Sequence, residues 1–355
     1  MKVDQKRQIR IKDIAQRANV SIGTVDRVLH NRGEVSEETR ETVMRIIKEL
    51  DYHPNVMARA LASKKKLLFA TLLPTPLSRE GYWTKPAAGI KKRISELRQF
   101  GISHESFTYS QNHPLDFVAK AEQILSLHPD GVVLAPFFSR ESLLFIARLK
   151  EGNVPFVFID SNIPDQGQLA YFGQNSYRCG MLSARLLSLL TPGGGSLLIL
   201  HYAKEMEHQN HLVQREMGFY EWYRKNQPDR QVRTFEISID DLNASHVKLK
   251  ELYEEYRPEG IFVTSSKVYL AARTIGEYGL HNIRLIGHDL LPENKKFLTV
   301  GIVDFLICQR PEEQGYDAVN ALFQGVVHKL PVREYNYAPI EIITRENLEF
   351  YHEFK

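Results

Sequence analysis

Apolar residues in the first fifty positions recur at helical spacing in three short groups. The groups are Ile11, Ile14, Ala15 and Ala18; then Val25, Val28 and Leu29; then Val43, Ile46, Ile47 and Leu50. A break at Asn19-Val20 separates the first two groups, and Ser21 and Ser36 are favourable N-caps for the second and third helices. The pattern therefore predicts three short helices around one small core.

From Leu67 onward, apolar strands alternate with amphipathic helical stretches. The clearest strands are Leu67 to Leu73, Gly131 to Ala135, Phe156 to Asp160, Ser196 to Leu200, Gly260 to Thr264 and Ile283 to Gly287. The helical stretches include Ala87 to Phe100, Leu115 to Leu127, Tyr177 to Leu190, Glu216 to Asn226 and Val268 to Tyr278. Such alternation implies doubly wound parallel sheets with helices on both faces. There are enough units for two sheets, which predicts a two-lobed α/β body with a cleft.

Composition places the chain among ordinary globular proteins. Of its 355 residues, 43% are hydrophobic and 25% are charged, and no apolar run is long enough to cross a bilayer. The stretch from Met1 to Lys12 alternates charges and lacks the apolar segment of a secretory signal. The two cysteines, Cys179 and Cys308, lack metal-ligand spacing and favour a reducing compartment. We expect a cytoplasmic, nucleoid-associated protein without a membrane partner.

The net charge of +3 is unevenly distributed along the chain. Residues 1–66 hold fifteen Lys and Arg against nine Asp and Glu, whereas the remainder holds thirty-one against thirty-four. A basic surplus confined to one end suits a segment that binds a polyanion, although a solvated charged face gives the same count.

The exposed face of the second helix carries the candidate DNA contacts. Opposite its buried stripe lie Ile22, Gly23, Asp26, Arg27 and His30. Two helices across a short turn form a helix-turn-helix, whose second helix fits the major groove, and Arg27 is suited to grip guanine bidentately. Hydrogen-bonding residues suited to phosphates are Ser21, Thr24, His30, Ser36, Thr39, Tyr52 and Asn55. A helical bundle that docks on a protein remains the alternative from this pattern.

A resemblance to a known family favours DNA over a protein as the partner of this helical unit. The sequence runs that carry the resemblance are Ile11-Lys12-Asp13-Ile14-Ala15, Val20 to Leu29, Val35 to Arg40, Leu50 to Asn55 and Ala58 to Ala62. Together they resemble the headpiece of the lactose-repressor/galactose-repressor (LacI/GalR) family. The resemblance assigns base reading to Ile22, Gly23 and Arg27. Asp26 replaces a common Ser; a carboxylate there would have to accept from a cytosine amino group or orient Arg27, which affects operator preference.

The resemblance also implies a hinge helix and a dimer. It assigns Ala58, Leu61 and Ala62 to the minor groove, with Leu61 as a wedge at the operator centre, whereas an isolated Leu would more simply be buried. Two such helices must pair, which implies a homodimer on a pseudo-palindromic operator. The implied domains are 1–56 for DNA binding, 57–66 for hinge and linker, and 67–355 for ligand sensing.

The body after Leu67 resembles the type I periplasmic-binding-protein-like core of the same family. The predicted first lobe comprises about 67–172 plus 301–330, and the second about 173–300 plus 331–355. Ligands in such bodies lie between the lobes at the carboxyl ends of parallel strands. The effector contacts expected there are Tyr82, Trp83, Asp160, Asn210, His211, Ser265, Asp289 and Gln309.

Two departures from sugar-binding relatives suggest an unusual pocket. Val213 stands where those relatives often have an Arg, and Ser265-Ser266 replaces a common Asn-Asp pair. A sugar or polyol is the first expectation for the effector; a sugar acid, a sugar phosphate or a nucleobase stays open. Asp160 and Asp289, each ending a buried strand, could otherwise serve only to cap loops.

The sequence indicates neither catalysis nor a cofactor. It lacks a Gly-x-Ser-x-Gly elbow and a His-Glu-x-x-His run, and Thr191 to Gly195 lacks the Lys-Ser/Thr of a P-loop. His208 and His211 have metal-ligand spacing but no further ligands nearby, so no metal is expected. We therefore expect a transcriptional regulator of repressor type, whose affinity for its operator is controlled by a small polar effector. The alternative is a sugar-acting enzyme or binding protein with an appended helical interaction domain.

Overall fold

A computed structural model of the chain describes residues 9–29, 33–50, 66–202, 210–239 and 241–351. The chain divides into two compact units, Met1–Lys64 and Lys65–Lys355. Along the described residues, no helix combines the length and the apolar character that crossing a membrane requires.

The first unit contains the three predicted helices. They are α1 (Ile11–Arg17), α2 (Ile22–Leu29) and α3 (Glu37–Glu49). Their buried residues form one core, made of Ile14, Ala15, Val25, Val28, Val43 and Ile46. The Ser21 and Ser36 hydroxyls accept from the backbone N–H groups of Thr24 and Thr39. The predicted helices, their core and both N-caps are confirmed.

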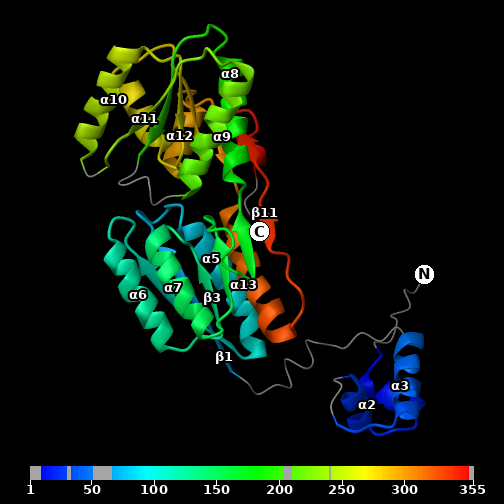
Figure 1. The fold of residues 1–355 in the computed structure, drawn as a ribbon. Helices are drawn as coiled ribbons and strands as arrows, with labels where there is room; N and C mark the ends of the chain where they lie inside the picture. The colour runs from blue at the N-terminus through cyan, green and yellow to red at the C-terminus, as the bar shows by residue number, and fades with distance from the viewer. Residues whose placement is uncertain (1–8, 30–32, 51–65, 203–209, 240, 352–355) are drawn as a thin grey trace. The chain divides into compact units, whose positions relative to one another are not determined.

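The second unit consists of two α/β lobes, each with a six-stranded sheet (Figure 1). The first sheet has the order β11-β5-β4-β3-β1-β2 and the second β12-β10-β9-β8-β6-β7. The strands of the first sheet are β1 (Leu67–Pro74), β2 (Ile102–Tyr109), β3 (Gly131–Leu134), β4 (Phe156–Ile159), β5 (Ala170–Gly173) and β11 (Tyr335–Tyr337). Those of the second are β6 (Leu197–His201), β7 (Val232–Glu236), β8 (Gly260–Val263), β9 (Arg284–His288), β10 (Phe305–Cys308) and β12 (Glu341–Ile343). All pairings are parallel except β10–β12, which confirms the predicted parallel sheets.

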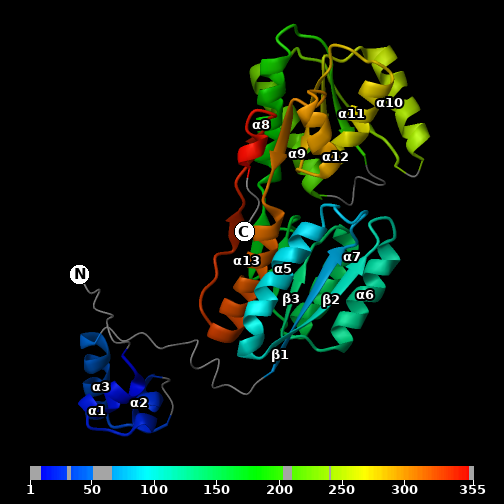
Figure 2. The same cartoon turned by 180° about the vertical axis from the view of Figure 1, so that it is seen from behind.

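Helices cover both faces of each sheet (Figures 1 and 2). The first lobe has α5 (Thr84–Leu97), α6 (Pro114–Ser126), α7 (Ser139–Glu151) and α13 (Pro311–Leu322), with the short helices η1 (Arg98–Phe100) and η3 (Phe323–His328). The second has α8 (Ser176–Leu190), α9 (Asn210–Asn226), α10 (Leu242–Tyr256), α11 (Val268–Glu277) and α12 (Pro292–Thr299), with η4 (Leu348–Phe350). Alternate strand residues pack against opposite helix layers: Leu198 and Leu200 join the α10–α12 core, and Leu197 and Ile199 join the α8–α9 core.

The chain crosses between the lobes three times, after β5, after β10 and after β11. The predicted lobe boundaries differ from this arrangement. The range 301–330 includes β10, which pairs with β9 in the second sheet, and 331–355 includes β11, which pairs with β5 in the first. Periodicity cannot assign such short strands to a lobe, because the sheet that accepts them is decided by hydrogen bonding to strands far away in sequence.

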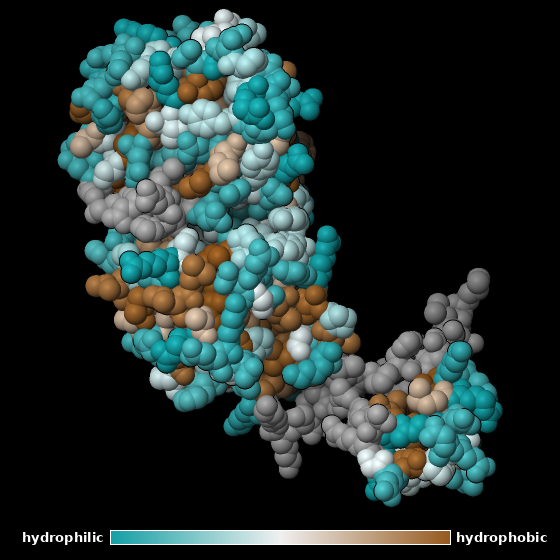
Figure 3. All heavy atoms as spheres, in the orientation of Figure 1, coloured by the Kyte–Doolittle hydropathy of each residue, from teal (hydrophilic) through white to brown (hydrophobic). Residues whose placement is uncertain are grey.

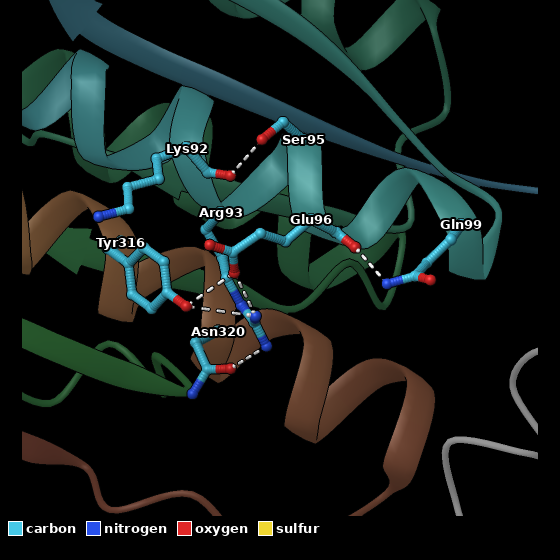
Figure 4. Close-up of polar contacts among 7 residues, drawn as sticks. All are labelled: Lys92, Arg93, Ser95, Glu96, Gln99, Tyr316 and Asn320. Atoms are coloured by element: carbon cyan, nitrogen blue, oxygen red, sulfur yellow. Dashed lines mark hydrogen bonds and ion pairs between the residues drawn. The ribbon is translucent and has the colours of Figure 1, made fainter.

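One helix pair in each lobe crosses at glycine. A Cβ added to Gly89 of α5 would lie 1.9 Å from the Glu312 carbonyl oxygen, and one added to Gly180 of α8 would lie 1.8 Å from the Arg215 oxygen. Close backbone approach at these crossings therefore requires glycine. In the first lobe, Arg93 of α5 joins α5 to α13 through a hydrogen bond to Asn320 at 2.7 Å, and it also donates to Glu96 of its own helix at 2.7 Å (Figure 4). Its guanidinium also lies 5.3 Å from the centroid of the Tyr316 ring.

Candidate functional site

The exposed face of α2 is built as the helix-turn-helix prediction expects. Val25 and Val28 are buried, while Ile22 is 53% exposed and Gly23 and Arg27 are also exposed. A half-exposed isoleucine contributes little to the stability of the three-helix core. Asp26 is half-buried, so it is less available to a ligand than Arg27. The assignment of these four residues to base contacts remains a prediction.

The other predicted DNA contacts divide into two groups. Ser21, Thr24, Ser36 and Thr39 lie at the N-termini of α2 and α3, where their hydroxyls hydrogen-bond within each cap. Helix N-termini present backbone N–H groups that suit phosphate. The remaining predicted residues lie outside the described residues; they are His30, Tyr52, Asn55, Ala58, Leu61 and Ala62.

A cavity of about 160 Å³ lies between the two lobes of the second unit. All but one of the predicted effector residues line it: Tyr82, Trp83, Asp160, His211, Ser265, Asp289 and Gln309. The exception is Asn210, whose side-chain amide instead donates to the Asn162 carbonyl of the first lobe at 2.8 Å. Residues that are distant in sequence thus lie together at the carboxyl ends of parallel strands, where ligands of such folds bind.

Asp160 and Asp289 occupy equivalent positions in the two lobes. Each follows a buried strand, β4 or β9, and each has a left-handed backbone with φ of 64°. Each backbone N–H donates to the neighbouring strand: Asp160 to Phe172 at 2.8 Å and Asp289 to Ile307 at 2.9 Å. Aspartate tolerates this conformation better than most residues, and the turn directs both carboxylates to the cavity.

The two carboxylates have different partners. Tyr82 donates its hydroxyl to Asp160 at 2.6 Å, and Gln309 donates its amide to Asp289 at 3.0 Å. Burial raises the pKa of Asp289 to about 7, although Arg215 and the Gln309 hydrogen bond act in the opposite direction. Burial also raises the pKa of Tyr82, so its hydroxyl stays a donor. The site combines strong acceptors with fixed donors, which suits a ligand rich in hydroxyl groups.

Aromatic rings form one wall of the cavity. Trp83 is only 6% exposed and meets Tyr82 edge to face, with 5.2 Å between ring centroids. Trp83 both packs in the first lobe and lines the cavity, and its contact with an effector remains a prediction.

Sequence reasoning missed two cations of the cavity, Arg215 and Lys267. Arg215 is 3% exposed and donates to the Thr264 carbonyl at 2.6 Å. The sequence has Val213 at the position where sugar-binding relatives often have an Arg, and the cavity nevertheless contains an arginine two residues later. The helix begins at Asn210 rather than near Glu216, and this earlier start turns Arg215 into the cavity. Lys267 follows the Ser265-Ser266 pair at the start of α11, where position alone could have identified it.

Gln174, also missed, joins all three crossings between the lobes. Its side-chain amide donates to the Cys308 carbonyl at 2.7 Å and to the Pro339 carbonyl at 2.9 Å. Its own oxygen accepts from the Cys179 thiol at 3.1 Å. Because it follows β5 in the first crossing and binds residues of the second and third, Gln174 ties the hinge of the cleft together.

Comparisons with known proteins agree with this architecture. Residues 10–55 match the model of bacterial regulatory proteins of the lacI family, and residues 70–329 match that of a periplasmic binding protein domain. Catabolite control protein A of Staphylococcus xylosus is 30% identical over 159 residues, which are 45% of this chain and 46% of that protein. The HTH-type transcriptional regulator RegA of Clostridium acetobutylicum is 48% identical over 64 residues, 18% of this chain and 19% of that protein. These alignments span less than half the length of the curated relatives.

Solved structures extend the likeness over the second unit. The glucose-galactose binding protein GanP of Geobacillus stearothermophilus aligns with a TM-score of 0.70 at 22% identity, covering 80% of this chain and 99% of that one, which is a likeness of fold. A putative LacI transcriptional regulator from Bacteroides fragilis aligns with a TM-score of 0.77 at 31% identity, over 81% of this chain and 100% of that one. With a matching headpiece and a matching body, the chain belongs to the lacI family of bacterial regulatory proteins.

Proposed function

We propose that this protein is a DNA-binding transcriptional regulator of repressor type, whose affinity for operator DNA is controlled by a small polar effector. The proposal depends on one observation: the same chain contains a helix α2 with an exposed face and a separate body with a polar cavity. An enzyme or a transport receptor would leave the headpiece without a use.

The α2 surface supports major-groove recognition. Ile22, Gly23 and Arg27 are exposed on a helix anchored by its opposite face. An arginine can donate to O6 and N7 of guanine together, and an exposed isoleucine can contact a thymine methyl group. The prediction that residues 57–66 form a hinge helix in the minor groove of a pseudo-palindromic operator, with the protein as a homodimer, forms part of the proposal. The protein is proposed to act in the cytoplasm, on the nucleoid.

The cavity supports a monosaccharide-sized polyol as the class of effector. Asp160 and Asp289 offer acceptors from opposite lobes, so one ligand bound to both would hold the lobes together. Proteins of this fold include some described as glucose-galactose binding and some in complex with D-arabinose. A ligand changes operator affinity only if it binds the two arrangements of the lobes unequally.

The DNA part of the proposal is tested with Arg27→Ala in the full chain. Operators are selected from random duplexes, and affinity is measured by fluorescence anisotropy at several salt concentrations. Loss of a bidentate base contact should cost about 1–3 kcal/mol on the selected operator and relax the preference at one base pair. Arg45→Ala is the matched control, because Arg45 is 66% exposed on α3 and pairs with Glu49. A wild-type chain without salt-sensitive affinity for any duplex would refute the proposal.

A further inference from the structure

A hydrogen bond and a ring contact join the two lobes outside the three chain crossings. Asn210, the first residue of α9 in the second lobe, donates its side-chain amide to the Asn162 carbonyl of the first lobe at 2.8 Å. The neighbouring His211 ring lies 6.4 Å, between ring centroids, from the Phe137 ring of the first lobe. We call these four residues the interlobe contact.

The interlobe contact joins two segments that carry residues of the cavity. Asn162 comes two residues after Asp160, and Asn210 comes five residues before Arg215. Both Asp160 and Arg215 line the cavity. The spacing between Asn162 and Asn210 therefore governs how far apart the ligand-facing groups of the two lobes lie.

Buried hydrogen bonds fix α9 to the second lobe. The His201 imidazole, fully buried at the end of β6, lies between the Thr264 hydroxyl at 2.7 Å and the Glu216 carboxylate of α9 at 3.0 Å. The Thr234 hydroxyl of β7 donates to the same carboxylate at 2.7 Å. Because these partners belong to the second sheet or directly follow its strands, a restraint at Asn210 acts on the whole lobe.

The other side of the interlobe contact is fixed to the first sheet. The Tyr171 hydroxyl of β5 donates to the Asp160 carbonyl at 3.0 Å, and the Ser161 N–H donates to the Ile159 carbonyl of β4 at 2.7 Å. The segment that carries Asn162 is thus held in the first lobe. A hydrogen bond to it therefore restrains that lobe as a whole.

The interlobe contact also contains groups that oppose it. Among the described residues, Ser161 Oγ, Asn162 Oδ1 and His211 Nδ1 are buried and have no hydrogen-bond partner. Such atoms favour an arrangement of the lobes in which water reaches them. The observed spacing therefore depends on few favourable contacts, and the loss of one of them should shift the balance measurably.

We propose that Asn210 is a positioning residue, whose bond to Asn162 holds the lobes near the ligand-binding spacing before an effector binds. This inference rests on the proposed role of the cavity as the effector site. The apparent affinity for a ligand rises with the fraction of the protein that is already in the binding-competent arrangement. The interlobe contact thus supplies part of the closure that the effector would otherwise have to drive.

The test measures the distance between the lobes in the ligand-free full chain. Spin labels are attached through Leu144→Cys on α7 and Val247→Cys on α10, two exposed helix positions in different lobes (Figure 1). Cys179 and Cys308 are buried, so the labels attach selectively. Double electron–electron resonance is recorded with the labelled chain diluted in an excess of unlabelled chain, so that only distances within one chain contribute.

Asn210→Asp is the main variant, because aspartate has nearly the same shape, suits a helix N-terminus and, when ionised, cannot donate to a carbonyl. The ratio of long to short interlobe distances should rise about three- to tenfold, as expected for the loss of one partly buried hydrogen bond. Asn210→Ala, which adds no charge, should give a rise of the same order. Asn226→Ala is the matched control and should leave the distances unchanged, because Asn226 ends the same helix and its amide donates to Trp222 within it.

The outcomes separate this inference from the proposed function. Unchanged distances in both Asn210 variants would overturn the positioning role, as would an equal shift in Asn226→Ala or a shift in Asn210→Asp alone, which would assign the effect to the added charge. None of these results affects the regulator proposal. Operator affinity of the unlabelled Asn210→Asp chain is measured in parallel, without effector. Lobes that separate with no change in operator affinity would support the positioning role and refute control of operator binding through the lobes.

Discussion

The two lobes of the sensing unit share a backbone plan and differ in side-chain chemistry. Each has a six-stranded sheet, a glycine-mediated helix crossing and a left-handed aspartate after a buried strand. The first lobe gives the cavity Tyr82 and Trp83, whereas the second gives it Arg215 and Lys267. On the face shown in Figure 3, brown apolar surface is more extensive on the first lobe. The common plan fixes where ligand contacts can lie, and the differing side chains decide what binds.

Alanine substitutions at the two glycine crossings should have the largest effects, and their effects on effector binding should differ between the lobes. Gly180→Ala would drive its Cβ into the Arg215 backbone, and Gly315→Ala would drive its Cβ to 2.1 Å from the Pro86 oxygen. Each change should lower the free energy of unfolding by about 3 kcal/mol, because backbone must move. Only Gly180→Ala should also weaken effector binding, since it displaces the helix turn that carries Arg215. Urea unfolding and calorimetry check both effects; equal loss of binding in the two variants would contradict a lobe-specific role.

Asp289→Asn should stabilise the protein in a pH-dependent way. Burial raises the pKa of Asp289 from 3.8 to about 7, so ionisation favours the unfolded state. The folded state therefore loses stability, relative to its value below pH 4, as pH rises from about 4 through 7. The uncharged variant avoids this loss and should gain on the order of 2 kcal/mol at pH 8 and nothing near pH 4. Chemical unfolding at both pH values tests this; a gain that is equal at both would rule out the charge as its cause.

Gln174→Leu tests whether the lobes are coupled at their crossings. Its loss leaves the Cys308 and Pro339 carbonyls without this donor, at a cost of about 1–2 kcal/mol in stability. Gln168→Leu removes a buried amide of the first lobe that donates to Glu334 at 3.3 Å, so it serves as the control. Only Gln174→Leu should change the ligand-free radius of gyration in X-ray scattering. An unchanged radius would indicate a local role.

Arg93→Met should have the smallest effect. It removes the hydrogen bond to Asn320 and the contact with the Tyr316 ring, which join α5 to α13, and also the hydrogen bond to Glu96 within α5 (Figure 4). We expect a loss of about 1 kcal/mol, since the methionine retains much of the apolar packing. Effector affinity should stay within a factor of two, because Arg93 does not line the cavity. A large loss of affinity would show that the α5–α13 pair also positions the site.

The sequence predicted well wherever local periodicity carried the information. The three headpiece helices, both serine caps and the buried strands β1, β3, β4, β6, β8 and β9 follow from patterns within a few residues. Edge strands such as β2, half-exposed over Ile102–Tyr109, give no clear apolar run. Asp160 and Asp289 were identifiable because each ends such a run, at the sheet edge where ligands bind.

The chain's own pattern thus determined its elements, its two-part organisation and the strand ends that face a ligand, because these depend on neighbours in sequence. Tertiary structure alone decided which lobe accepts β10 and β11, how Gln174 joins three crossings, and that Arg215 and Lys267 line the cavity. The direction of a buried side chain depends on where a helix starts and on which distant strands lie beside it. Periodicity contains no record of those long-range contacts.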